Sequence, residues 1–157
     1  EICIIHNGWQ RKHVRSIELA YQKTPFFNDY FDALEFILMA KYERLAELNE
    51  ALLMFAFEKL GIDIPIMHAS GCNLEGQKSE LIIDMCEQFR ANKFIFGAMG
   101  EDYADKKAFK KAEIEIEFQK FEHPVYQQLH GEFAPNMSFI DALFNLGPAA
   151  KELLCVT

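Results

Sequence analysis

The chain has 157 residues, half of them hydrophobic and a quarter charged. This length and composition are typical of a globular protein with one core, so we expect a single domain over residues 1–157. The formal net charge of −8 argues against a general nucleic-acid binder, because such surfaces need clustered Lys and Arg. It leaves room for a small anionic substrate or donor, because the local field of a pocket can oppose the net charge.

Four cysteines are scattered along the chain without a C-x-x-C pair: Cys3, Cys72, Cys86 and Cys155. This pattern predicts reduced thiols in the cytoplasm rather than a disulfide framework or a zinc ribbon. No apolar run approaches the roughly 20 residues needed to span a bilayer. The start has no signal-peptide pattern. The chain lacks an initiator Met and opens on an apolar run, so we expect further residues before Glu1.

The first third of the chain is predicted to form one strand and three helices. The apolar residues 2–5 predict a short strand that ends at Asn7-Gly8. Hydrophobic periodicity predicts helices over about residues 9–22, 26–39 and 42–60. Leu and Phe recur at helical spacing in the third helix and Gly61 follows it, which predicts a substantially buried helix with a glycine end.

The middle of the chain alternates between strand and helix patterns. The strands are predicted at residues 64–68, 93–96 and 113–118, and the helices at 79–91 and 103–111. This order predicts a mainly parallel sheet with right-handed crossovers. The last strand alternates Glu with apolar residues, so we expect it to be half exposed, with Ile114, Ile116 and Phe118 facing inward. Two helices, at residues 138–145 and 148–154, are expected to close a helix-rich α/β fold whose sheet is flanked by helices.

A basic cluster lies in the first turns of the first predicted helix: Arg11, Lys12, His13 and Arg15. Cations there oppose the positive end of the helix dipole, at a cost of about 0.3–1 kcal/mol each when exposed. An anionic ligand would offset that cost, which favours a phosphate or carboxylate clamp. The alternative is a solvated basic face.

Two glycine-containing turns are the next candidate ligand sites. Gly76-Gln77-Lys78-Ser79 opens a helix that Ser79 is expected to cap, with Lys78 and free backbone N–H groups facing an anion. The full phosphate-loop pattern is absent, and an ordinary loop with a capped helix is the alternative.

The second turn, from Gly97 to Gly100, follows a predicted strand, and ligands of open parallel sheets bind beyond such strand ends. We expect Gly97, Gly100, Asp102 and Tyr103 to line a pocket. A tight turn explains the glycines equally well.

The long loop after residue 121 carries His123, Tyr126, Gln128 and His130. Long ordered loops in compact domains are often functional, and histidine acts as a general acid or base near neutral pH. We expect His123 to be catalytic and Tyr126 and Gln128 to bind ligand. The alternative is that His123 and Tyr126 hydrogen-bond the backbone and pin the loop to the core. The histidines lack metal-ligand spacing, so no metal site is predicted, and the sequence does not identify a cofactor.

Several residue blocks occur together in a specific order and spacing. They are Trp9-Gln10-Arg11-Lys12-His13, Glu43-Arg44-Leu45, Glu75-Gly76-Gln77-Lys78-Ser79, Phe96-Gly97 to Gly100 with Asp102-Tyr103, and Phe121-Glu122-His123-Pro124-Val125-Tyr126 with Gln128 and Asp141. In these blocks the chain resembles the WbqC-like family over nearly its whole length. That family usually carries a further leading segment with a Gln-Pro and aromatic motif, which we expect to precede Glu1.

The resemblance implies a role in bacterial surface-polysaccharide synthesis of the O-antigen type. The implied activity is that of a transferase or ligase acting on an activated acyl, aminoacyl or sugar donor. Arg11, Lys12 and the Gly97–Gly100 turn would hold an anionic donor, and His123 would serve as the base. The alternative is a non-catalytic module that binds a ligand or a partner enzyme of the same pathway.

Overall fold

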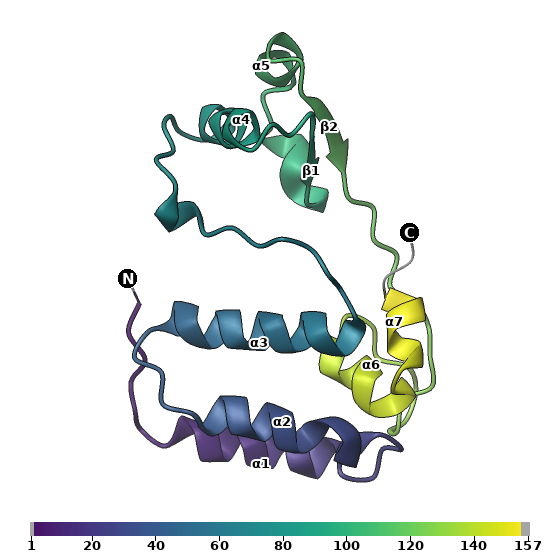
Figure 1. Ribbon diagram of the computed structural model, residues 1–157. Coiled ribbons are helices and arrows are strands. Elements are labelled where there is room, and N and C mark those ends of the chain that lie inside the picture. The colour runs from purple at the N-terminus through teal and green to yellow at the C-terminus, as the bar shows by residue number, and fades with distance from the viewer. Residues whose placement is uncertain (1, 155–157) are drawn as a thin grey trace. The chain divides into compact units, whose positions relative to one another are not determined.

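The computed structural model describes residues 2–154, and the contacts divide them into two units (Figure 1). Unit 1 takes the described residues of Glu1–Ile64 and His123–Thr157, and unit 2 is Pro65–Glu122. Each unit has its own hydrophobic core and is described by itself. The expectation of one domain over residues 1–157 stays a prediction, and Cys155 lies outside the described residues.

Unit 1 is built from helices around an aromatic-rich core. Its helices are α1 (Trp9–Tyr21), α2 (Phe27–Met39), α3 (Leu45–Leu60), α6 (Phe139–Leu146) and α7 (Ala149–Leu154). Helix α2 packs against α1, α3 and α6, and Figure 1 shows α1 and α2 side by side. The Phe27 ring stacks on Phe31 at 4.3 Å between centroids and lies 5.4 Å from Phe144. These contacts place α6 against the end of the α1–α2 pair.

Helix α3 begins three residues later than its sequence pattern predicts. The Glu47 carboxylate accepts hydrogen bonds from the backbone N–H groups of Glu43 at 3.2 Å and Arg44 at 3.1 Å. These bonds satisfy donors that a helix start leaves without partners and fix its first turn at Leu45. Gly61 ends the helix with a φ of 60°, as its glycine pattern predicts.

The strand predicted at residues 2–5 is wrong. The segment forms one isolated antiparallel bridge, Cys3 with Arg44, and its backbone bonds the turn before α3. Ile2 and Ile5 are 70% and 78% exposed. A run of β-favouring residues becomes a strand only when another strand pairs with it along its length, and here the partner turns into a helix.

Unit 2 contains the sheet. Its elements are α4 (Ser79–Gln88), β1 (Lys93–Phe96), α5 (Lys106–Lys111), β2 (Glu115–Phe118) and two short 3₁₀ helices, η1 (Ala69–Gly71) and η2 (Ala98–Asp102). Strands β1 and β2 pair in parallel, with Lys93 opposite Glu115 and Phe96 opposite Phe118. The predicted helix-rich α/β class with a parallel sheet is therefore confirmed.

The alternation before and along β2 behaves as predicted. Ile114 is buried, and Ile116 and Phe118 are partly buried, whereas Glu115 and Glu117 are exposed. Lys93 bridges both glutamates at 3.2 Å. Phe109 of α5 is fully buried and packs on the sheet beside Phe96, at 5.4 Å between ring centroids.

The strand predicted at residues 64–68 is also wrong. That segment has no strand pairing, and Ile64 and Met67 are 56% and 64% exposed. Pro65 explains part of the error, because proline lacks the N–H that a ladder bond requires. The described sheet therefore has two strands rather than three. Across residues 2–154, no helix combines the length and apolar character required to cross a membrane.

Candidate functional site

The most unusual polar group of unit 1 is the carboxylate of Asp141, in the first turn of α6. Asp141 is 4% exposed, and its neighbours in sequence are apolar. Its Oδ2 accepts hydrogen bonds from the Tyr126 hydroxyl at 2.7 Å and from Gln128 Nε2 at 2.9 Å. The N-terminal position in a helix favours a negative charge. A charged, buried acceptor is thus held by two side chains of the 123–137 loop.

Two tyrosines near this carboxylate have a raised pKa. Burial, followed by the hydrogen bond to Asp141 and its negative charge, raises the pKa of Tyr126 to about 12. Burial, followed by the charge of Asp141 and a hydrogen bond to it, raises the pKa of Tyr21 far above its usual value. Both phenols therefore stay protonated at neutral pH and act as hydrogen-bond donors, not as general bases.

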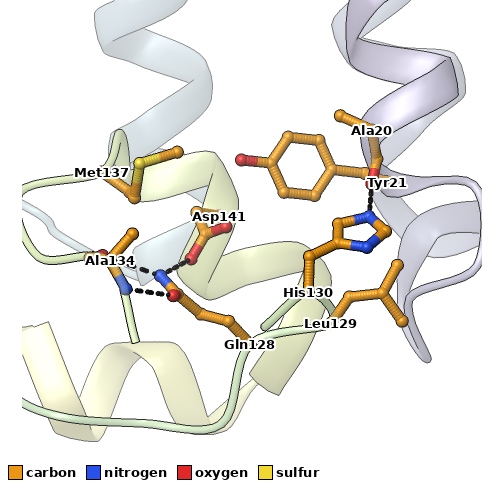
Figure 2. A pocket seen from close by; sticks show the side chains of 8 residues that line it. All are labelled: Ala20, Tyr21, Gln128, Leu129, His130, Ala134, Met137 and Asp141. Carbon is orange, nitrogen blue, oxygen red and sulfur yellow. Dashed lines mark hydrogen bonds between the residues drawn. The ribbon is translucent and has the colours of Figure 1, made fainter. Parts of the chain in front are cut away.

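A pocket of about 180 Å³ adjoins this cluster (Figure 2). It is lined by Ala20, Tyr21, Gln128, Leu129, His130, Ala134, Met137 and Asp141. Figure 2 shows the Tyr21 hydroxyl on the side of its ring that faces Asp141 and Met137. Much of the lining is apolar, with a few polar groups placed among it, which is the usual character of a small-molecule site.

The polar lining residues are fixed by backbone contacts. His130 Nε2 lies 3.0 Å from the Ala20 carbonyl oxygen, and because a carbonyl only accepts, Nε2 carries the proton. Gln128 Nε2 donates to the Ala134 carbonyl at 3.0 Å, and Gln128 Oε1 accepts from the Ala134 N–H at 2.8 Å. The α1 end, the loop and the α6 start are thereby tied around one hollow.

Two of the predicted ligand-binding residues, Tyr126 and Gln128, meet at Asp141. His123 lies next to them, with its ring centroid 6.1 Å from that of Tyr126 and 5.7 Å from that of Phe133. Its Nδ1 donates to the Pro124 carbonyl at 2.9 Å. This backbone contact matches the alternative in which His123 pins the loop, and the catalytic role of His123 stays a prediction.

The predicted basic clamp lies elsewhere on α1. Arg11, Lys12 and His13 are exposed in the first half of the helix, whereas Tyr21 is its last residue. At a rise of 1.5 Å per residue, Lys12 and Tyr21 are separated by about 13 Å along the axis. The structure therefore does not bring these cations to the Asp141 pocket, and their role as an anion clamp stays a prediction.

In unit 2, Lys78 and Tyr103 come together. Both line a hollow with the first turn of α4 and Asp105, which caps α5. The expected cap by Ser79 is wrong: Lys78 is the N-cap residue with a φ of 53°, and the buried Ser79 Oγ instead accepts from the Asp105 N–H at 3.0 Å. Ser79 is the first residue of α4 rather than the residue before it, so it is not at the capping position, and its hydroxyl serves the start of α5.

The glycine turn after β1 has a packing explanation at one of its two glycines. A Cβ on Gly100 would overlap the Phe96 side chain, while a Cβ on Gly97 would meet no atom within 4 Å. Asp102 and Tyr103 follow at the end of η2, and both are exposed. This turn lies in unit 2, whereas His123 and Arg11 lie in unit 1. Because the two units are described separately, a shared site for these residues stays a prediction.

Within residues 2–154, no group of three or more His, Cys, Asp or Glu side chains is arranged to hold a metal ion. Cys3, Cys72 and Cys86 are free thiols, and burial raises the pKa of the Cys86 thiol.

The sequence interpretation missed Tyr21 and Asp141 as site candidates, and it assigned no role to His130 in the candidate loop. A signal for Asp141 was present, because an acid inside Phe139–Leu146, an otherwise largely apolar helix, must be buried or paired. No comparable signal marked Tyr21, whose partner lies 120 positions away.

Comparison with known proteins identifies the family of the chain. A sequence model of the WbqC-like protein family matches residues 1–153. The chain belongs to the WbqC-like protein family. It is similar to the uncharacterized protein Rv1507c of Mycobacterium tuberculosis, at 29% identity over 156 residues, which are 98% of this chain and 68% of that protein. No solved structure matches the chain. The resemblance seen in the residue blocks is thus confirmed.

Proposed function

We propose that this WbqC-like chain takes part in bacterial surface-polysaccharide synthesis in the cytoplasm, as a transferase or ligase that uses an activated acyl, aminoacyl or sugar donor. The pathway and reaction class rest on the family resemblance, which is an associational argument. The observation that carries the proposal in this chain is the buried Asp141 carboxylate at the wall of a pocket. Titratable groups with a shifted pKa in a hollow, such as Tyr21 in the lining of this pocket, are typical of functional sites.

In this proposal the Asp141 pocket receives the small acceptor group. A carboxylate held by Tyr126 and Gln128 accepts a hydrogen bond from an amine or hydroxyl and so positions the acceptor group for transfer. At about 180 Å³ the pocket is smaller than the 300 Å³ at which drug-sized sites begin, so the donor would lie outside it. His123, beside Tyr126, is the proposed base for the transfer step.

A transfer assay tests this proposal. The chain is incubated with nucleotide sugars, acyl-CoA donors, or ATP with amino acids, together with sugar and amino-sugar acceptors, and products are identified by mass spectrometry. We expect one donor class to give product, and His123→Ala to lose turnover while its circular dichroism is unchanged. His6→Ala is the matched control, because His6 is an exposed histidine of the same unit.

A second candidate, a non-catalytic binding module, is favoured by one observation. His123 Nδ1 is taken by the Pro124 carbonyl, and Tyr126 and Gln128 already bond Asp141. A module binds a small ligand without turnover. Binding with no product from any donor would overturn the transferase proposal in favour of this candidate.

A further inference from the structure

The polar side chains that line the Asp141 pocket use their donor groups within the chain, and the Tyr21 hydroxyl bonds Asp141 itself. Gln128 uses its Nε2 donor group on Asp141 and Ala134, and its Oε1 on the Ala134 N–H. His130 Nε2–H is taken by the Ala20 carbonyl, so this donor is not available to a ligand. A ligand that complements this pocket must therefore bring donors.

The charge of Asp141 also favours a ligand that brings hydrogen-bond donors. The side-chain hydrogen bonds to Asp141 come from neutral groups, those of Tyr126, Gln128 and Tyr21. Among the described residues, no Lys, Arg or His forms an ion pair with Asp141. Buried charges are usually paired, because desolvation is costly and neutral donors spread a charge without cancelling it. A ligand cation would supply the missing partner.

A second hollow, of about 280 Å³, adjoins the first. The two share Gln128 and Leu129 as lining residues, so only this short stretch of the loop separates them. The second hollow is lined by Lys23, Gln127 and Asn145, and Lys23 is exposed. Lys23 has no ion pair or hydrogen bond within the described part of the chain. A negative and a positive group thus flank Gln128 and Leu129.

We infer that the two adjoining hollows hold one small zwitterion, with its ammonium group against Asp141 and its carboxylate or phosphate against Lys23. Each hollow alone is smaller than a typical small-molecule site, and the two together fall within the usual size range. A free amino acid and an amino-sugar phosphate share this chemistry. The inference rests on the proposed function, because it names the substrate class of the same pocket.

Isothermal titration calorimetry with probes that differ in one charged group tests the inference. The probes are a set of amino acids, glucosamine 6-phosphate, its N-acetylated form, and glucosamine without phosphate. We expect one zwitterion to bind, N-acetylation to weaken binding at least about tenfold, and loss of the phosphate or carboxylate to weaken it less, because the exposed Lys23 is more strongly screened. Amino acids and glucosamine 6-phosphate are titrated separately, so the result shows which of the two classes supplies the ammonium group.

Two variants assign the ends of the ligand. Asp141→Asn should abolish the preference for the free amine, and Lys23→Gln should reduce the affinity of the zwitterion to that of the amine alone. Lys41→Gln is the matched control, because Lys41 is an exposed lysine of unit 1 outside both hollows. If Asp141→Asn does not fold, Lys23→Gln and the N-acetylated probe still decide the question.

Two results would overturn the inference, and they differ in meaning. If N-acetylated and free amines bind equally and Asp141→Asn leaves that binding unchanged, the zwitterion assignment is wrong while a small-ligand site remains. If no probe and no transferase donor or acceptor binds, the pocket is not a ligand site and the proposed function fails with it.

Discussion

Replacing Tyr126 by Phe removes one hydroxyl and leaves the ring packed against His123 and Phe133. The lost hydrogen bond is 2.7 Å long and ends on the Asp141 carboxylate, which is 4% exposed. Hydrogen bonds to charged groups contribute about 1.5–3 kcal/mol. Because Gln128 still donates to the same oxygen, we expect the free energy of unfolding to fall by about 2 kcal/mol.

Urea unfolding followed by fluorescence measures this loss. Trp9, the chain's one tryptophan, lies in α1, so its emission reports on unit 1. The urea concentration at the unfolding midpoint should fall, while the dependence of the free energy of unfolding on urea concentration stays constant. Tyr30→Phe is the matched control, because the Tyr30 hydroxyl forms no hydrogen bond within residues 2–154 and its loss should cost less than about 0.5 kcal/mol. Equal midpoints for the wild type and Tyr126→Phe would refute the account of Asp141 as a buried, hydrogen-bonded charge.

Two further predictions concern pH and packing. Tyr126 should ionise with a midpoint of about 12, seen as phenolate absorbance that Tyr126→Phe lacks. Because an unfolded tyrosine ionises near pH 10, its contribution to stability is complete below pH 10 and is lost as pH rises toward 12; constant stability over that interval would contradict the raised pKa. Gly100→Ala forces a Cβ into Phe96 and should cost about 1–3 kcal/mol in thermal unfolding followed by circular dichroism. Gly97→Ala, which meets no atom, should cost less than about 0.5 kcal/mol, and equal costs for the two would refute the packing role of Gly100.

Local pattern was sufficient for much of the fold. Helical periodicity located α1 and α2, and the alternation at residues 113–118 located β2 and its buried side. These signals are short in range, because a helix or an amphipathic strand displays its own period in sequence. The same reasoning failed at residues 2–5 and 64–68, since β propensity does not reveal whether a partner strand is present.

The candidate site was predicted only in part. Tyr126 and Gln128 were expected to bind ligand; Gln128 lines the pocket, and Tyr126 bonds Asp141 in its wall. Tyr21 and Asp141 are 120 positions apart, and no local pattern predicts that α1 ends where α6 begins. The basic residues of α1 form a cluster that is conspicuous in sequence, whereas the signal for Asp141 is a single acid in an apolar helix and does not identify its partners.

Nuclear magnetic resonance mapping of ligand binding tests the central claim most directly. Glucosamine 6-phosphate or the best-binding amino acid is titrated into ¹⁵N-labelled chain. The account predicts saturable shifts of the Ala134 and Ala20 amides and of the Gln128 side-chain amide, which surround the pocket, with all three lost in Asp141→Asn. Shifts confined to the hollow of Lys78 and Tyr103, or unchanged spectra at high ligand concentration, would contradict a ligand site at Asp141.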